Sequence, residues 1–203
     1  MSQKMSTVDC YRLYWRMTKL GTLTRRYIVI GAFDGALTIV AIVLAALASA
    51  LLLNVQINIS DVNLLVRAGL SAGVGLAISS GWGAYEAERV ERKRELQDLE
   101  VQMQRSMDGC MVDSAVHFAT AWASFIHGIA PLPAAILPLI PLILLPADFV
   151  TASVISVSVT MCFLFFLGTW MARISKTNIF AGGLRIVFAV LITALLCVLI
   201  GAV

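Results

Sequence analysis

The stretch YIVIGAFDGALTIVAIVLAALASALLL, residues 27–53, decides the fold of this chain. It is apolar from end to end and contains a single charged residue, Asp34. A helix needs about 20 mainly apolar residues to cross about 30 Å of hydrocarbon, and this run is longer than that. It therefore predicts a membrane-spanning helix that carries a carboxylate inside it.

Four more apolar runs follow, at about 64–85, 114–145, 149–172 and 183–203. The chain as a whole is 60% hydrophobic and 13% charged, whereas soluble domains average about 45–50% apolar and about 25% charged residues. The runs do not alternate polar and apolar residues as barrel strands do, and a helix satisfies its own backbone groups in lipid. We therefore expect an all-α integral membrane protein with five transmembrane helices.

The basic residues predict the orientation of these helices. Every Lys and Arg except Arg67 falls before the first run, between the second and third, or between the fourth and the start of the fifth. The positive-inside rule then places the N-terminus in the cytoplasm and the C-terminus outside, which an odd number of spans also requires. The expected location is a prokaryotic plasma membrane, with a vacuolar-type membrane as the alternative.

Two polar pieces lie outside the apolar runs. Residues 1–26 are expected to form a cytoplasmic N-terminal segment without a cleavable signal, and residues 9–20 mix aromatic, apolar and basic side chains as an interfacial helix does. Residues 86–113 are rich in charge and in helix formers, which predicts a short cytoplasmic helical insertion that continues the second helix. Residues 27–203 are expected to form one five-helix transmembrane domain around it.

Asp34, in the motif GAFDG, is the first candidate for a functional residue. A charged side chain at the centre of a membrane helix costs about 2.5–3.5 kcal/mol on insertion scales, so such carboxylates normally face a cavity and serve ions or protons. A structural hydrogen bond to a helix end or to a neighbouring serine is the alternative. Gly31 and Gly35 permit close helix approach or a local break that exposes carbonyl groups. We predict that Asp34 binds metal and carries protons.

Three further polar residues lie within the apolar runs. Ser79 and Ser80 occur near the cytoplasmic end of the second run, at a depth similar to that of Asp34, and their hydroxyls are candidate metal ligands. The alternative for both serines is small-residue helix packing. His127, in the third run, is a candidate for proton transfer, with a satisfied histidine between helices as the alternative.

The cytoplasmic insertion offers carboxylates and thioethers. Glu88, Glu91 and Glu95 share one helical face by their spacing, and Met103 and Met107 lie four residues apart. Carboxylates with thioethers nearby can gather a divalent transition metal, so these five residues are predicted to bind metal. The alternatives are a solvated helix whose acids pair with neighbouring Arg and Lys residues, and a methionine stripe that only packs.

The third run ends in PLPAAILPLIP, residues 131–141, which contains four prolines. Each proline inside a helix removes one backbone hydrogen bond and can kink the helix. Repeated kinks predict either a shaped cavity wall or a hinge, and the sequence does not choose between them.

These segments also carry a family resemblance. GAFDG (31–35) is similar to a first-helix signature, AISSGWGAY (77–85) to a second-helix pattern, and ATAWASFIHGIAPLPAAILPLIP (119–141) to a third-helix run. LFFLGTWMARISKTNIFAGGLRIVFAVLITALLCVLIG (164–201) looks like the last two helices of the same pattern. Together, in this order, the segments resemble the vacuolar iron transporter family.

The resemblance implies a homodimer of five-helix protomers in the lipid bilayer. Such a protein exports or sequesters divalent metal ions, Fe²⁺ or Mn²⁺ above all, from the cytoplasm in exchange for protons. The resemblance makes Asp34 the central metal or proton site, and it makes residues 86–113 a much shortened version of a metal-collecting module rich in Glu and Met. The metal is cargo, so no tightly bound cofactor is expected, and no nucleic-acid partner either.

Three positions depart from the family pattern. Phe33 stands where the family has asparagine, Ser80 where it has the pathway methionine, and Ala84 where it has a glutamate. The soft thioether that favours a transition metal is thus missing, which fits an altered substrate, a weaker site or a member that no longer transports. The alternative function is a non-transporting membrane scaffold or regulator that acts through residues 86–113. An enzyme is not expected, because the sequence shows no nucleophile–base pair, phosphate loop or closed metal-ligand cluster.

Overall fold

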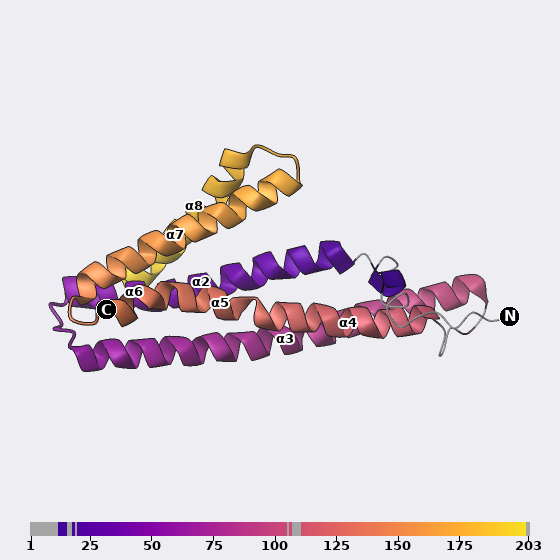
Figure 1. Ribbon diagram of the computed structural model, residues 1–203, viewed down its shortest axis with the longest axis horizontal. Helices are drawn as coiled ribbons and strands as arrows, with labels where there is room; N and C mark the ends of the chain where they lie inside the picture. Colours follow the sequence, from indigo (N-terminus) through magenta and orange to yellow (C-terminus); the bar gives the residue numbers. More distant parts are fainter. Residues whose placement is uncertain (1–11, 16–17, 19, 105, 107–110, 202–203) are drawn as a thin grey trace. The chain divides into compact units, whose positions relative to one another are not determined.

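The computed structural model describes residues 12–15, 18, 20–104, 106 and 111–201, and these residues contain helices but no strand (Figure 1). The elements are α2 (Leu20–Leu52), α3 (Ile59–Met103), α4 (Met111–Ile129), α5 (Pro131–Ile136), the 3₁₀ helix η1 (Leu137–Leu139), α6 (Ile140–Leu144), α7 (Phe149–Ile174) and α8 (Ile179–Gly201). Five helical stretches, with α4 to α6 counted as one, are long and apolar enough to cross a membrane. The predicted all-α fold with five spans is confirmed, while the orientation of the termini stays a prediction.

Two helices extend beyond the apolar runs that predicted them. α2 begins at Leu20 rather than at residue 27, and α3 continues through the charged segment to Met103. Apolar length marks the hydrocarbon layer, whereas a helix continues in water wherever its residues are good helix formers, as Arg, Lys and Glu are. Of the interfacial helix predicted over residues 9–20, residues 12–15 are helical, and most of the remaining segment lies outside the described residues.

Side-chain caps fix where two of the helices begin. The carboxylate of Asp148 accepts a hydrogen bond from the backbone amide of Thr151 at 3.2 Å, at the start of α7. Before α3, the Asp61 carboxylate accepts a hydrogen bond from the amide of Asn58 at 2.9 Å. Each bond satisfies an amide that a helix start would otherwise leave without a partner.

The third span is not one continuous helix. α4 ends at Ile129, α5 begins at Pro131, and η1 and α6 complete the crossing to Leu144. A proline has no amide hydrogen to donate to the preceding turn, so this proline-rich stretch is divided into short helical pieces. The predicted single run over 114–145 therefore becomes one long helix followed by three short ones.

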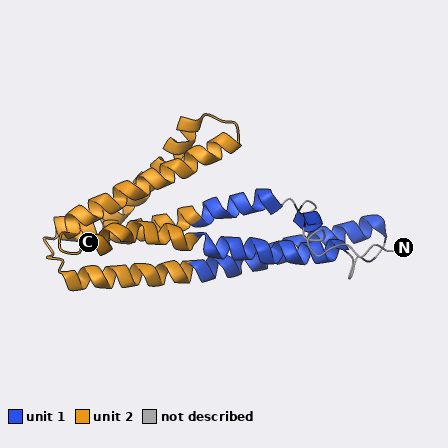
Figure 2. Cartoon of the chain, in the orientation of Figure 1, with its two compact units in different colours: residues 1–31, 77–130 blue, residues 32–76, 131–203 orange. Residues whose placement is uncertain are grey.

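The chain divides into two compact units (Figure 2). Unit 1 comprises residues 1–31 and 77–130, and unit 2 comprises residues 32–76 and 131–203. Helices α2 and α3 each contribute residues to both units. The expectation of one transmembrane domain over residues 27–203 stays a prediction.

Unit 2 is held together by close helix approach. A Cβ on Gly35 of α2 would overlap the backbone of Pro131 in α5, and a Cβ on Gly168 of α7 would lie 2.6 Å from the carbonyl oxygen of Gly182 in α8. Only residues without a side chain allow backbones to pack this tightly. Around these contacts lie two buried apolar clusters, one containing Ile39, Val43, Leu139 and Leu142, the other Ala36, Ala134, Leu164 and Val190.

Unit 1 also has one close glycine contact, between Gly81 of α3 and Gly128 of α4, where an added Cβ would meet the other residue at 3.1–3.3 Å. Polar bonds surround it: the Ser124 hydroxyl donates to the Gly81 carbonyl at 2.6 Å, and the Trp122 indole donates to the Thr24 hydroxyl at 2.9 Å. The buried apolar cluster here is small, and comprises Tyr27, Ala84 and Ala123.

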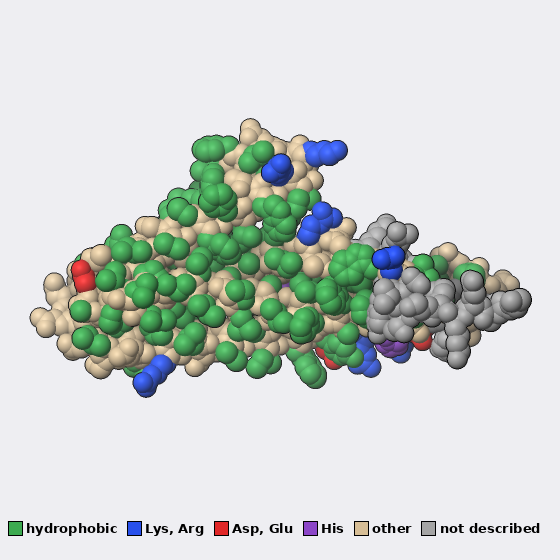
Figure 3. All heavy atoms as spheres, viewed as in Figure 1, with side chains coloured by type: hydrophobic (Ala, Val, Ile, Leu, Met, Phe, Trp, Pro, Cys, Tyr) green, Lys and Arg blue, Asp and Glu red, His purple; other side chains and the backbone are tan. Residues whose placement is uncertain are grey.

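Large apolar side chains remain exposed along every span. Figure 3 shows hydrophobic side chains spread over the face in view, and charged side chains confined to a few small groups. Such a surface would aggregate in water but is well solvated by lipid tails, which agrees with the membrane assignment made from composition.

Candidate functional site

Asp34 lies near the middle of α2, in unit 2, and is half-buried. Its backbone carbonyl accepts a hydrogen bond from the Thr38 hydroxyl at 2.7 Å. Its neighbour Gly35 is the residue against which the backbone of Pro131 packs. The carboxylate is thus placed next to the closest approach of α2 and the proline-rich segment, deeper in its helix than the sequence indicated, because α2 begins earlier.

No preformed metal cluster surrounds these residues. Within residues 12–104 and 111–201, apart from the positions left undescribed there, no group of three or more His, Cys, Asp or Glu side chains could hold a metal ion. A cation at Asp34 would therefore need hydroxyl, carbonyl or water oxygens to complete its shell, as hard and borderline divalent ions accept.

Ser79 and Ser80, the predicted partners of Asp34, belong to unit 1 rather than unit 2. Both lie on α3, with Ser79 exposed and Ser80 half-buried. Their role as metal ligands stays a prediction.

The three predicted glutamates line one cavity of about 750 Å³ in unit 1. Glu88, Glu91 and Glu95 come from the charged C-terminal part of α3, and two guanidinium groups, Arg26 of α2 and Arg92 of α3, line the same cavity. We call it the acidic cavity, because its carboxylates outnumber its basic groups. The helical spacing that placed the three glutamates on one face is thus seen in the structure.

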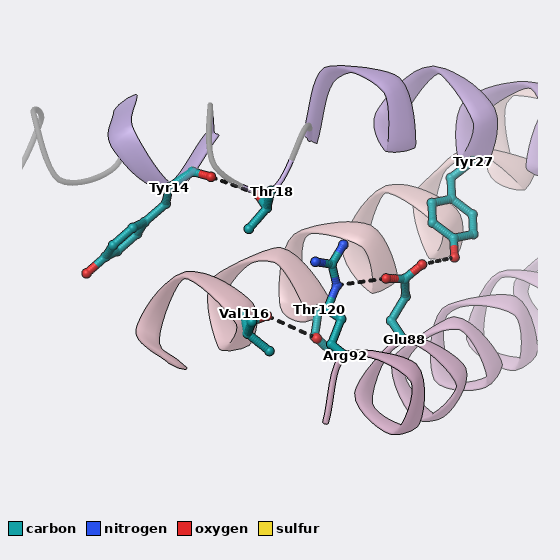
Figure 4. Close-up of polar contacts among 7 residues, drawn as sticks. All are labelled: Tyr14, Thr18, Tyr27, Glu88, Arg92, Val116 and Thr120. Carbon is teal, nitrogen blue, oxygen red and sulfur yellow. Dashed lines mark hydrogen bonds and ion pairs between the residues drawn. The ribbon is translucent and has the colours of Figure 1, made fainter. Parts of the chain in front are cut away.

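Glu88 differs from the other two because both of its oxygens are engaged (Figure 4). The Tyr27 hydroxyl donates to Oε1 at 2.6 Å, and the Arg92 guanidinium donates to Oε2 at 2.8 Å. The side chains of Glu88 and Arg92 are only 13% and 9% exposed. Pairing of acids with neighbouring basic residues was the alternative that the sequence left open, and for Glu88 this pairing is what the structure contains.

His127 lies beside the same tyrosine. Its Nδ1 is 3.3 Å from the backbone oxygen of Tyr27, and the two rings are tilted by 51° with their centroids 4.9 Å apart. The residue has a protein partner in unit 1, as the satisfied-histidine alternative requires, and its role in proton transfer stays a prediction.

Of the two methionines predicted to bind metal, the structure describes one. Met103 is the last residue of α3 and is exposed, and Met107 lies outside the described residues. The role of both methionines as metal ligands stays a prediction.

Comparison with known proteins decides the family. The VIT family model matches residues 102–202. An uncharacterized protein of the archaeon Methanocaldococcus jannaschii is 30% identical over 182 residues, which make up 86% of this chain and 87% of that protein. The chain belongs to the VIT family. This confirms the family predicted from the sequence and indicates metal-ion transport across a membrane, rather than catalysis, as the class of activity.

The VIT family match covers α4 to α8 and begins beyond Asp34, Ser79 and Ser80. The membership therefore supports the fold and the class of activity but assigns no role to these three residues.

Sequence reasoning missed one residue of this site, Tyr27, which it treated only as the first residue of an apolar run. Arg92 belongs to the basic residues that it named as possible partners of the glutamates, without choosing among them. The sequence signal for Arg92 was its position four residues after Glu88, which favours an ion pair on one helix. Nothing local pointed to Tyr27, because its partner Glu88 lies 61 residues away along the chain.

Proposed function

We propose that this VIT family protein moves divalent metal cations of the Fe²⁺ and Mn²⁺ class out of the cytoplasm in exchange for protons. The observation that carries the proposal is Asp34, a half-buried carboxylate near the middle of the membrane helix α2. Carboxylates at such depth are costly and typically serve ions or protons, and the family supports metal ions as the cargo. The archaeal relative favours a prokaryotic plasma membrane as the location.

Electrostatics explains why a metal and a proton would compete at Asp34. An ionised carboxylate in a low-dielectric setting is stabilised by hydrogen bonds and by partners of opposite charge. A proton or a divalent cation can supply that charge, and binding of one weakens binding of the other at the same oxygens. A higher proton concentration on the outer side would therefore release the metal there and drive the exchange.

The acidic cavity supplies a second element of the proposal. Glu91 and Glu95 line it and are exposed, so their negative charge attracts cations, and Arg26 on the same wall offsets part of that charge. Glu88 is assigned a structural role, because Tyr27 and Arg92 already occupy its oxygens. Of the three predicted glutamates, Glu91 and Glu95 remain as the proposed metal-collecting carboxylates of the acidic cavity.

We also propose a homodimer that packs through one face of α3. Four small residues recur every fourth position on this helix, and all four are exposed: Ser71, Gly75, Ser79 and Gly83. A Cβ at either glycine would meet nothing within 4 Å, so the face has room for a second backbone, and stripes of this kind mediate helix association in membranes. Gly75→Leu should then yield monomers by light scattering in detergent, whereas Ala181→Leu, at an exposed position of α8, should not.

The direct test of transport is metal flux into proteoliposomes under a proton gradient. Fe²⁺, Mn²⁺, Co²⁺ and Ca²⁺ are compared for the native protein and for Asp34→Asn, which keeps the shape but not the charge. Changes beside a metal ligand already cost about 10- to 100-fold in affinity, so loss of the carboxylate should lower flux at least tenfold. Asp98→Asn, at an exposed position of α3, is the matched control and should leave flux unchanged.

A second candidate function is the non-transporting scaffold or regulator. The observation that favours it is the engaged state of Glu88, whose two oxygens are bonded to Tyr27 and Arg92 instead of being open to a metal. If no cation crosses in either protein while Asp34→Asn remains folded, the transporter proposal fails. In that case, disruption of residues 86–113 should abolish the cellular phenotype.

A further inference from the structure

A second cavity of unit 1 lies between α3 and α4, and its chemistry differs from that of the acidic cavity. It has a volume of about 420 Å³, and Arg89 and Lys93 of α3 and His117 of α4 contribute polar groups to its wall. Leu96 and Val116 line both cavities. These two side chains therefore separate the acidic cavity from this one, which we call the basic cavity.

The α3 side of the basic cavity continues a single column of side chains. Ile78, Trp82, Tyr85, Arg89 and Lys93 follow one another at steps of three or four residues, so they share one helical face. Ile78 is 67% exposed and Trp82 is 69% exposed, and the rings of Trp82 and Tyr85 contact each other with centroids 6.3 Å apart. Along this face the character changes from aliphatic to aromatic to basic.

This order matches the layers of a membrane surface. Aliphatic side chains suit the hydrocarbon, Trp and Tyr concentrate at the interface, and Arg and Lys on the cytoplasmic side contact anionic headgroups. On α4 the order along the chain is reversed. The polar residues Asp113 and His117 come first, and the exposed Phe125 follows two turns after His117. Both walls thus place their polar groups at the cavity and their apolar groups beside it.

The charges within the basic cavity favour an anion. The cavity lining contains two basic residues, Arg89 and Lys93, and a single carboxylate, Asp113. Asp113 Oδ1 lies 3.5 Å from His117 Nε2. Arg89 also approaches Glu86, at 3.7 Å, but both of these side chains are exposed and the contact is weak. The cavity lies along the first turns of α4, where the helix dipole adds positive potential.

We propose that the basic cavity binds the phosphate of an anionic phospholipid, with Arg89 and Lys93 as the phosphate ligands and with the acyl chains lying along Trp82 and Ile78. A free phosphate ion would use only the basic groups and would leave the aromatic and aliphatic part of the column unexplained. A lipid uses the whole column, and basic pockets between membrane helices on the cytoplasmic side are known to take such headgroups. The volume suits a small ligand.

The test uses the full-length protein in detergent and counts bound lipids by native mass spectrometry. Phosphatidylglycerol and phosphatidylcholine with identical acyl chains are titrated separately. Native protein should retain phosphatidylglycerol preferentially. Because each basic residue near the headgroup contributes about fivefold in affinity, the Arg89→Gln/Lys93→Gln double variant should bind about 25-fold more weakly. Arg94→Gln removes a charge from the same helix outside the cavity lining and should leave binding unchanged.

A gain-of-binding variant keeps the proposal testable if the double variant does not fold, as judged by its circular dichroism. Asp113→Asn removes the one carboxylate of the lining and should increase phosphatidylglycerol binding by a few fold. Three results would each overturn the proposal: equal binding of the two lipids, an Arg94→Gln variant as weak as the double variant, or full competition by millimolar inorganic phosphate, which would identify a free-phosphate site.

Discussion

The two units of this protein join their helices through different kinds of contact. Unit 2 joins its helices through glycines and apolar clusters, with backbone against backbone at Gly35 and Pro131. Unit 1 has a small apolar cluster and joins its helices through hydroxyl, indole and carboxylate bonds around two cavities. The contacts that join the helices of unit 2 are mainly apolar, whereas the charged groups that join those of unit 1 must pair with one another or with water. The comparison indicates that close apolar packing holds unit 2 together and that polar bonds around cavities hold unit 1 together.

The largest expected difference in stability between variants of the two units is at Gly35. Gly35→Ala would place a methyl group into the backbone of Pro131, and overpacking of this kind costs typically 1–3 kcal/mol, occasionally more. The free energy of unfolding, measured by SDS titration with tryptophan fluorescence, should fall by about 3 kcal/mol. Gly21→Ala, on the same helix but in unit 1, is the control, because its Cβ would meet only Trp15 at 3.8 Å. Equal effects at both glycines would contradict the close-packing account of unit 2.

The polar packing of unit 1 is tested at Glu88, with a smaller expected effect. Glu88→Gln removes the charge that pairs with the nearly buried Arg92 and with Tyr27. Because hydrogen bonds to charged groups contribute about 1.5–3 kcal/mol and this pair retains some exposure, we expect a loss of about 2 kcal/mol in the same titration. Glu95→Gln, at an exposed position, should change stability by less than about 0.5 kcal/mol.

A double variant tests whether Tyr27 stabilises unit 1 through its hydrogen bond to Glu88. Tyr27→Phe should destabilise the native protein but have little further effect in a Glu88→Leu background, where residue 88 offers no acceptor to the Tyr27 hydroxyl. Additive losses would show that Tyr27 stabilises unit 1 by packing instead of through its hydroxyl.

The smallest expected effect belongs to the exposed cap of α7 in unit 2. Hydrogen bonds from Thr151 hold the pKa of Asp148 below its ordinary value of 3.8. A lowered pKa in the folded state means that the cap stabilises the protein at pH values above 3.8 and that this contribution is lost as pH falls through the folded-state pKa. Asp148→Asn should therefore lower the unfolding temperature slightly at pH 7 and leave it unchanged near pH 2. A difference that persists near pH 2 would assign the effect to something other than the ionised carboxylate.

Much of the fold follows from local features of the chain. The length and apolar character of each run predicted five helical spans, because crossing hydrocarbon requires a fixed length and internal backbone bonds. The helix ends were less well predicted. α2 starts before the apolar run, and α3 starts at a cap formed by Asn58 and Asp61, because capping and helix propensity act outside the lipid as well.

The candidate site was predicted only in part. The spacing of Glu88, Glu91 and Glu95 correctly placed them together, since residues on one face of a helix are set by its periodicity. The same periodicity could not show that Glu88 is already bonded to Tyr27, that Arg92 is nearly buried, or that Arg89 and Lys93 open into a different cavity from their acidic neighbours.

The sequence by itself determined that this protein is an all-helical membrane protein with one carboxylate deep in its first span, because hydrophobic length and an unusual charge are properties of a single segment. Only the tertiary structure decided which charges are paired, which glycine faces a backbone, and how α3 divides acidic from basic side chains between two cavities. The physical reason is that these features depend on residues far apart in the chain, whose contacts are set by how the helices pack and by no local pattern.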